Sequence, residues 1–124
     1  MQRLVLLVED SETTVLVTQM QLEFLGYRVA IARNGVEAVA QAANDHPDLI
    51  VMDIHMPVMD GLQATAQIRK NPQTNAIPIL AATAKAMSGD RERCLASGCN
   101  AYLAKPYTHR ELGAEIKKLL KDSP

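Results

Sequence analysis

Residues with reactive side chains stand at the ends of four short apolar segments of this chain. They are carboxylates, a hydroxyl group and an ammonium group: Glu9 and Asp10 after residues 4–8, Asp53 after residues 49–52, Thr83 at the end of residues 79–83, and Lys105 after residues 101–104. If these segments are strands of one parallel sheet, their carboxyl ends open on the same edge of the sheet. We therefore expect three carboxylates to share one crevice with a threonine and a lysine.

Carboxylates brought together in this way repel one another, and Lys105 supplies too little positive charge to balance three of them. A divalent cation would neutralise the remainder. The donors on offer are hard oxygens without a cluster of His or Cys, which favours Mg²⁺, or Mn²⁺, over Zn²⁺. Because Mg²⁺ held by one or two carboxylates typically works with phosphate, the pattern indicates phosphate chemistry.

In such a crevice we interpret Asp53 as a nucleophile as well as a metal ligand, because carboxylates can accept a phosphoryl group as an acyl phosphate. Lys105, the Thr83 hydroxyl group and a nearby backbone N–H would hold the phosphoryl oxygens. An aspartate after a strand is, by itself, most often a turn former or a helix cap. The prediction depends on finding the whole set at strand ends in this order.

The rest of the chain supplies the elements that would position these residues. Apolar runs predict five strands, at residues 4–8, 28–32, 49–52, 79–83 and 101–104. The longer segments between them are predicted to be helices, with capping residues at their ends: Asn34, Asp60, Ser88 and Thr108 at N-termini, Gly26 and Gly98 at C-termini. Five strand-then-helix units predict an α/β fold with a parallel sheet covered by helices on both faces.

Length and composition limit the alternatives. The chain has 124 residues, the size of one domain, so we treat residues 1–124 as a single unit. The formal net charge of −1 gives no reason to expect nucleic-acid or membrane binding, and no apolar run approaches the length of a membrane span. Cys94 and Cys99 fit neither a zinc pattern nor a disulfide framework, and as reduced thiols they favour a cytoplasmic location.

Four motifs give the chain a clear resemblance to the receiver domains of two-component response regulators. They are LVEDS at 7–11, DLIVMDIHMPVMDG at 48–61, ILAATA at 79–84 and YLAKPYT at 102–108. Residues 88–106 look most like receivers that belong to hybrid histidine kinases or work with them. The resemblance covers essentially the whole chain. It implies a flavodoxin-like (βα)5 fold, a three-layer sandwich around a five-stranded parallel sheet of order 2-1-3-4-5.

The resemblance also implies a role for each residue at the strand ends. Asp53 would be the phospho-acceptor, taking its group from a phosphohistidine. Asp10, Asp53 and the backbone carbonyl group of His55 would bind Mg²⁺, with Glu9 assisting through a water molecule. Lys105 would contact both the phosphoryl group and Asp53.

A second set of residues would respond to the phosphoryl group. By resemblance, Thr83 and the backbone N–H of Ala84 would close on the phosphate once it arrives. Tyr102 stands at the position of the family's switch aromatic and would turn inward as Thr83 moves. The peptide bond between Lys105 and Pro106 would be cis.

Two positions that vary within the family tune the lifetime of the acyl phosphate. They are occupied here by His55, two residues after the acceptor, and Lys85, two residues after Thr83. The His55 side chain could hinder or assist the attacking water. Alternatively, it is an exposed loop residue of which only the backbone carbonyl group is used.

The resemblance further implies partners. A histidine kinase or a histidine phosphotransfer protein would donate the phosphoryl group, and an unidentified downstream protein would read the altered surface. The first predicted helix, about residues 12–25, has one apolar stripe to cover the sheet and a second one roughly opposite, made of Leu16, Met20 and Phe24. We expect this second stripe to contact the helical hairpin of the phosphoryl donor or a second copy of the chain in a homodimer, unless core packing absorbs it.

The leading prediction is a signalling switch, not an enzyme: a phospho-acceptor domain that assists its own phosphorylation and dephosphorylation. An interaction module that no longer accepts phosphate is one alternative, although every reactive position is present. A phosphatase of the haloacid dehalogenase type also uses a strand-end aspartate. In that class, however, the nucleophile should follow the first strand, and the position of His55 should be acidic.

Overall fold

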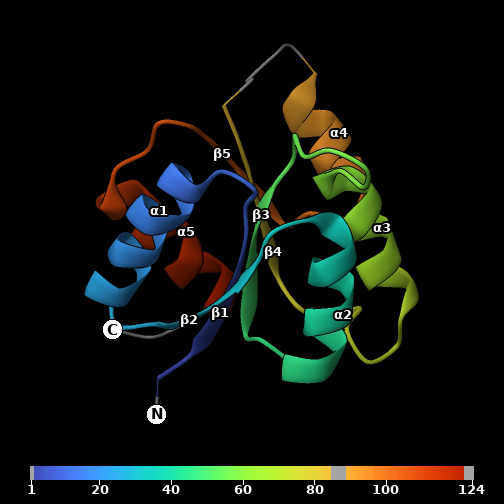
Figure 1. The fold of residues 1–124 in the computed structure, drawn as a ribbon, viewed down its shortest axis with the longest axis horizontal. Coiled ribbons are helices and arrows are strands. Elements are labelled where there is room, and N and C mark those ends of the chain that lie inside the picture. The colour runs from blue at the N-terminus through green and yellow to red at the C-terminus, as the bar shows by residue number, and fades with distance from the viewer. Residues whose placement is uncertain (1, 85–88, 122–124) are drawn as a thin grey trace.

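The computed structural model describes residues 2–84 and 89–121, which form alternating strands and helices (Figure 1). The strands in these ranges are β1 (Leu4–Val8), β2 (Arg28–Ala32), β3 (Leu49–Asp53), β4 (Ile79–Thr83) and β5 (Ala101–Ala104). The helices are α1 (Glu12–Phe24), α2 (Gly35–Asp45), α3 (Gly61–Lys70), α4 (Asp90–Ala96) and α5 (His109–Leu120). Four strands have the boundaries expected from the sequence, and β3 extends one residue further to include Asp53.

The sheet is parallel throughout, with the strand order β2-β1-β3-β4-β5 that the resemblance implied. The residues of β3 and β4 are all buried, as are those of β1 after Leu4. Helices cover both faces of these inner strands, which explains why their sequences, apart from Asp53 and Thr83 at the ends of β3 and β4, are apolar throughout instead of alternating. At the edge of the sheet, β2 is half-buried along most of its length, in line with its more mixed sequence.

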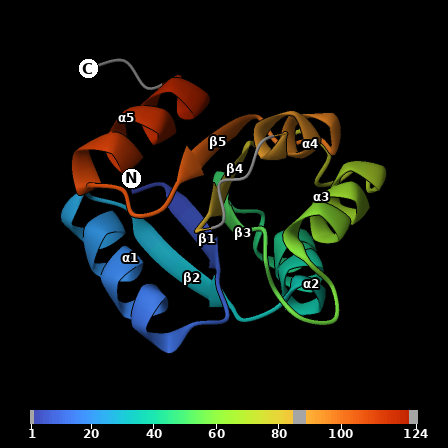
Figure 2. The ribbon, with the colours of Figure 1, turned by 90° about the horizontal axis from the view of Figure 1, so that it is seen from above.

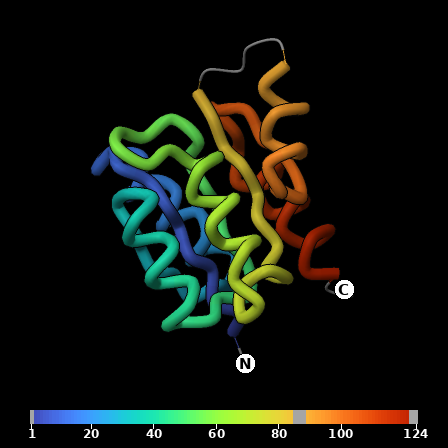
Figure 3. The backbone as a smooth tube through the Cα atoms, turned by 90° about the vertical axis from the view of Figure 1, so that its right-hand side faces the viewer, coloured from blue at the N-terminus to red at the C-terminus, as the bar shows by residue number. Residues whose placement is uncertain are grey.

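The helices form two layers, one on each face of the sheet (Figure 2). Helices α1 and α5 cover one face, where Leu22 and Ile116 join the buried cluster on the sheet. Helices α2, α3 and α4 cover the other face, where Ala42, Ile68 and Cys94 do the same. On that face α2 and α3 lie side by side (Figure 3). The protein is therefore the three-layer α/β sandwich predicted from its sequence.

Capping side chains fix where several helices begin. Asn34, Asp60 and Thr108 each accept a hydrogen bond from a backbone N–H in the first turn of α2, α3 and α5. Asp60 also forms a reciprocal capping box with Gln63. This box starts α3 soon after β3 ends at Asp53, so the chain between them is a short loop at the carboxyl edge of the sheet.

Glycines end two of the helices, as expected. Gly26 follows α1 with a φ of +97°, and Gly98 follows α4 with a φ of +113°, a left-handed region that glycine adopts without strain. The predicted cap Ser88 lies outside the described residues. In the structure α4 begins at Asp90, with Gly89 in the N-cap position and no side-chain capping bond there.

Candidate functional site

The parallel register brings the predicted residues to one edge of the sheet. Asp53, the last residue of β3, is in register with Ala82 of β4. The backbone N–H of Lys105 donates a hydrogen bond to the carbonyl oxygen of Thr83 at 2.8 Å, which places the end of β5 beside the end of β4. Glu9 follows β1, the neighbour of β3 on its other side. The acids, the hydroxyl group and the ammonium group therefore converge as the sequence predicted.

Three carboxylates form a cluster at this edge. One carboxylate oxygen from each of Glu9, Asp10 and Asp53 lies within 4.8 Å of the others. Glu9 is 3% exposed and Asp53 is 6% exposed, whereas Asp10 lies on the surface. The Nζ atom of Lys105 lies 3.6 Å from Asp53 Oδ1. Lys105 balances one of the three negative charges, so the cluster favours a further cation.

The electrostatic environment of Asp53 opposes its negative charge. Burial raises the pKa of its carboxyl group from 3.8 to about 7, the positive charge of Lys105 lowers it, and the negative charge of Glu9 raises it again. Hydrogen bonding from the backbone of His55 lowers it to a smaller extent. Because these effects leave the pKa high, a cation bound beside Asp53 would stabilise the ionised form that a nucleophile needs.

A direct bond between Lys105 and Glu9 was not predicted from the sequence. Lys105 Nζ donates to Glu9 Oε1 at 2.6 Å, and Glu9 Oε2 accepts the backbone N–H of Ser11 at 3.2 Å. Burial lowers the pKa of Lys105, but the bond to Glu9 and the charge of Asp53 outweigh burial and raise it overall. The lysine is thus held charged between two buried carboxylates. The resemblance had placed it on Asp53 and had given Glu9 a role through water.

The remaining predicted residues of the site lie on the neighbouring strands. Thr83 is fully buried at the end of β4, and Ala84 is exposed directly after it. Tyr102 lies on β5 and is half-buried. The peptide bond between Lys105 and Pro106 is cis, as the resemblance implied. Lys85, predicted to tune the phosphate lifetime, lies outside the described residues.

Comparison with known proteins identifies the family. The family described as "Response regulator receiver domain" matches residues 5–117. The chain is 38% identical to the polar-differentiation response regulator DivK of Brucella ovis over 123 residues, which are 99% of this chain and 100% of DivK. This chain belongs to the response regulator receiver domains. It therefore acts in two-component signalling, as predicted.

Solved structures agree with this assignment of the receiver domain. The receiver domain of a sensor histidine kinase from Pseudomonas aeruginosa PAO1 is 40% identical, with a TM-score of 0.92 over 98% of this chain and 100% of that one. That structure has a magnesium ion coordinated in its active-site cleft. The chemotaxis protein CheY4 of Vibrio cholerae is 29% identical, with a TM-score of 0.90 over 96% and 99% of the two chains. In the described part of the present receiver, none of the helices has the length and apolar character needed to cross a membrane.

The first helix of the receiver has two distinct faces. Val15, Thr18 and Leu22 are buried against the sheet. On another face three apolar side chains are exposed, with relative exposures of 60% for Leu16, 68% for Met20 and 76% for Phe24. The Phe24 ring meets the ring of His109 on α5 edge-to-face, at 5.3 Å between centroids. Core packing thus does not absorb the second stripe, which we call the α1 stripe.

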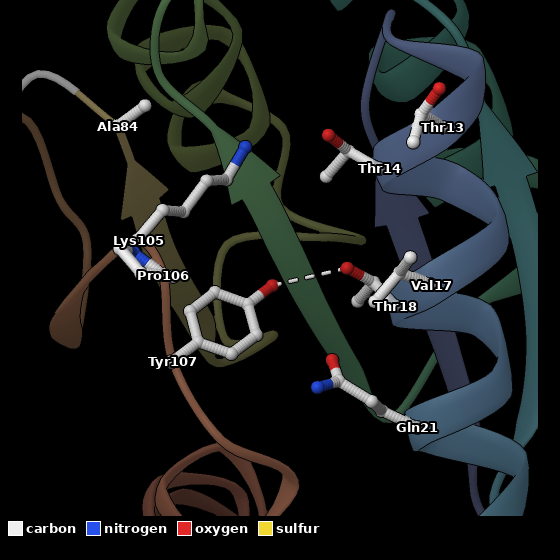
Figure 4. A pocket seen from close by; sticks show the side chains of 9 residues that line it. All are labelled: Thr13, Thr14, Val17, Thr18, Gln21, Ala84, Lys105, Pro106 and Tyr107. Atoms are coloured by element: carbon white, nitrogen blue, oxygen red, sulfur yellow. Dashed lines mark hydrogen bonds between the residues drawn. The ribbon is translucent and has the colours of Figure 1, made fainter.

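A cavity of about 440 Å³ lies between α1 and the loop from β5 to α5 (Figure 4). It is lined by Thr13, Thr14, Val17, Thr18, Gln21, Ala84, Lys105, Pro106 and Tyr107. Figure 4 shows the hydrogen bond of 3.2 Å between the hydroxyl groups of Thr18 and Tyr107. The Oε1 atom of Gln21 is buried without a hydrogen-bond partner in residues 2–84 and 89–121. Since Lys105 lines this cavity and contacts the acid cluster, the cavity connects the surface of α1 with the site.

One buried acid near the site was not predicted from the sequence. Asp90, the first residue of α4, is 2% exposed. Its carboxylate pairs with Arg93 and lies 3.9 Å from His55 Nε2. An acid at the start of a helix, in the polar stretch 88–93, is normally solvated, so nothing in the sequence marks this one as buried.

Proposed function

We propose that this receiver accepts a phosphoryl group on Asp53 from a phosphohistidine of a histidine kinase or a histidine phosphotransfer protein. The acid cluster is the main support for this assignment. Asp53 is a buried strand-end carboxylate with two more carboxylates within 4.8 Å and the Lys105 ammonium group at 3.6 Å. A group placed in this way has a cation-binding environment for an arriving phosphate and little contact with bulk water.

The residues present fit a magnesium ion. Their donors are carboxylate and carbonyl oxygens, and their negative charge exceeds what Lys105 balances. Asp10, Asp53 and the backbone carbonyl group of His55 would hold the ion, and Glu9 would assist through water. When bound, the ion would neutralise charge on the phosphoryl oxygens, and Mn²⁺ would suit the same donors.

The transfer step itself is assigned to Asp53. A carboxylate oxygen of Asp53 attacks the phosphorus atom, and the bond from phosphorus to the donor's imidazole nitrogen breaks, leaving its electron pair on that nitrogen. The product is an aspartyl phosphate on this chain. Lys105 holds one phosphoryl oxygen by charge, and the Thr83 hydroxyl group and the Ala84 N–H hold the others.

The arrival of a dianionic phosphoryl group would then change the surface of the receiver. The phosphoryl group of the product carries a charge of roughly −2 near neutral pH, which attracts nearby hydrogen-bond donors. Thr83 would move toward it, and Tyr102 on the adjacent strand would turn inward. We assign the resulting change to the surface of α4, β5 and α5, where a downstream protein would bind.

The α1 stripe is our candidate for the docking surface of the phosphoryl donor. Three supporting features are the exposure of Leu16, Met20 and Phe24, their place on a helix whose opposite face packs on the sheet, and the adjoining cavity that reaches Lys105. A helical hairpin that lies along α1 could bury these side chains and bring its phosphohistidine to Asp53. The free buried cysteines Cys94 and Cys99 are compatible with a reducing, cytoplasmic setting.

Acetyl phosphate or beryllofluoride with Mg²⁺ tests the acceptor directly. We expect one adduct on the unmodified protein, none on Asp53→Asn, and an unchanged adduct on Asp45→Asn, which alters an exposed aspartate of α2. Many turnovers of substrate without a stable adduct would indicate a phosphatase. A folded protein that forms no adduct under these conditions would be an interaction module that works without phosphate.

A further inference from the structure

A buried carboxylate of α4 lies against the loop that follows the acceptor. Asp90 has a side chain only 3% exposed, and its Oδ2 atom lies 3.9 Å from His55 Nε2. Its Oδ1 atom pairs with the guanidinium group of Arg93, one turn further along the same helix. None of the roles proposed above for phosphoryl transfer uses Asp90.

The burial of this charge calls for a physical reason. A buried carboxylate is unfavourable unless charged or hydrogen-bonding groups surround it. Arg93 has a side chain that is 62% exposed, so it could pair with an acid at the surface of α4 just as well. Instead the Asp90 carboxylate is buried, and it lies against a histidine from the loop that follows β3. This contact links α4 to the loop after the acceptor.

An imidazole ring beside a fixed carboxylate has a restricted orientation. The His55 Nε2 atom faces the carboxylate at 3.9 Å, which is an electrostatic contact and too long for a hydrogen bond. Asp90 is itself immobilised by burial at the start of α4, whereas the His55 side chain is 38% exposed. The carboxylate is thus the rigid partner of the pair, and the ring of His55 is the group that it holds.

His55 is well placed to affect the acceptor. It lies two residues after Asp53, and hydrogen bonding from its backbone acts on the Asp53 carboxyl group. Asp53 is only 6% exposed, so few side chains border the opening through which water would reach an aspartyl phosphate. Because His55 follows Asp53 by two residues, a ring of restricted orientation there would block or direct this water more consistently than a freely rotating ring.

We infer that Asp90 is a positioning residue which fixes the His55 ring and thereby sets the rate at which water hydrolyses the aspartyl phosphate on Asp53. In this reaction the water oxygen attacks phosphorus, the bond from phosphorus to the Asp53 carboxylate oxygen breaks, and inorganic phosphate leaves. The assignment of this role to Asp90 rests on the proposed function of Asp53. It goes further by giving a residue of α4 control over the lifetime of the signal.

The rate of phosphate loss after removal of acetyl phosphate, in excess Mg²⁺, tests this role. We compare the unmodified protein with Asp90→Asn, His55→Ala and the double variant. Glu92→Gln is the matched control, because Glu92 is an exposed acid of the same helix. We expect Asp90→Asn and His55→Ala to change the rate several-fold in the same direction. The double variant should match the larger single effect, and the control should match the unmodified protein.

Two further measurements separate positioning from loss of fold. Asp90→Glu keeps the charge and moves the carboxylate by one methylene group, and it should also alter the rate. In the unphosphorylated protein, NMR of the histidine rings should show a shift of the His55 signals in Asp90→Asn but not in Glu92→Gln. The chain has 3 histidines, so His55→Ala identifies the signals.

The outcomes distinguish this inference from the function on which it rests. If Asp53 is phosphorylated normally but the Asp90 variants lose phosphate at the unmodified rate, the inference is overturned and the function stands. Effects of Asp90→Asn and His55→Ala that multiply in the double variant would also overturn it, since the two residues would then act independently. If the unmodified protein takes no phosphoryl group, both the function and this inference fail.

Discussion

The ammonium group of Lys105 donates a hydrogen bond of 2.6 Å to the carboxylate of Glu9, although the two residues come from opposite ends of the chain. The same ammonium group lies 3.6 Å from the carboxylate of the acceptor, Asp53. One positive charge is therefore shared between two buried negative charges. Any cation or phosphoryl group that enters the site must therefore redistribute these contacts.

Replacing Lys105 with methionine should strengthen Mg²⁺ binding and weaken phosphorylation. Without the ammonium group the carboxylates repel each other more, so the ion gains more by binding, by about tenfold in affinity or ~1.4 kcal/mol. Phosphorylation should slow because a phosphoryl oxygen loses its cationic partner. Calorimetric titration with Mg²⁺ and labelling with acetyl phosphate measure the two effects. Lys118→Met, at an exposed lysine of α5, is the control. Weaker Mg²⁺ binding in Lys105→Met would contradict this account.

The free energy of unfolding should depend on pH through Asp53. Burial raises its pKa from 3.8 to about 7 in the folded protein. Between these values the folded state holds a proton that the unfolded chain has lost, so stability falls as the pH rises. Without Mg²⁺, Asp53→Asn should therefore raise the free energy of unfolding at pH 8, on the order of 2 kcal/mol, and change it little at pH 4.

Chemical denaturation at the two pH values, with and without Mg²⁺, provides the check on Asp53. Saturating Mg²⁺ should reduce the difference in the free energy of unfolding between Asp53→Asn and the unmodified protein, because the ion stabilises the ionised acceptor of the unmodified protein. If Asp53→Asn raised the free energy of unfolding equally at both pH values, the effect would not come from ionisation of Asp53.

Gly61→Ala should destabilise the protein and disturb the acceptor. A Cβ atom at Gly61 would overlap the backbone carbonyl oxygen of Asp53, and it would also press on the backbone of Ile54. One of these backbones must shift, and we expect a loss of about 2–4 kcal/mol of stability with slower labelling of Asp53. Thermal unfolding and acetyl phosphate labelling measure both effects.

Gly113→Ala in α5 is the matched control for Gly61→Ala. The Cβ atom there would meet side-chain atoms of Leu25 at 3.1 Å, which can adjust, and alanine favours a helix. We expect this variant to unfold near the unmodified temperature and to be labelled normally. If both glycine variants behaved alike, the close approach of Gly61 to Asp53 would have no special importance.

The α1 stripe should matter for transfer from a protein donor and not for transfer from a small molecule. Leu16→Glu combined with Phe24→Glu should slow phosphotransfer from the cognate kinase or phosphotransfer protein at least about tenfold, while labelling by acetyl phosphate stays normal. Val36→Glu, at a 56% exposed apolar residue of α2, is the control. A changed oligomeric state with normal phosphotransfer would instead assign the stripe to contact between two copies. If neither property changes, the stripe is not an interface.

Much of the fold was predictable because its inner strands are covered on both faces. Residues 4–8 and 79–82 are continuously apolar for that reason, and the boundaries predicted for β1 and β4 agree with the structure. The convergence of Asp53 with Lys105 followed from the rule that parallel strands open on one edge. The start of helix α4 was harder to predict, because its N-cap position is occupied by Gly89, which has no side chain that could form a capping hydrogen bond.

The pairings inside the site were less predictable than its members. A sequence places Glu9 and Lys105 at strand ends, but the hydrogen bond between them depends on the register of β1, β3, β4 and β5. Asp90 was missed for a related reason. Its burial depends on how α4 packs over the loop that contains His55, and the polar sequence around Asp90 does not indicate such packing.

Phosphotransfer from a histidine kinase or a histidine phosphotransfer protein is the most direct test of the central claim. The donor is first labelled on its histidine and purified, and it is then mixed with this receiver in Mg²⁺. We predict that label leaves the donor and appears on the unmodified receiver, in a linkage that base hydrolyses and hydroxylamine cleaves, as an acyl phosphate requires. Asp53→Asn should remain unlabelled while the donor keeps its phosphate. Label on the Asp53→Asn receiver, or none on the unmodified protein with any donor of its organism, would contradict the assignment of Asp53 as the acceptor.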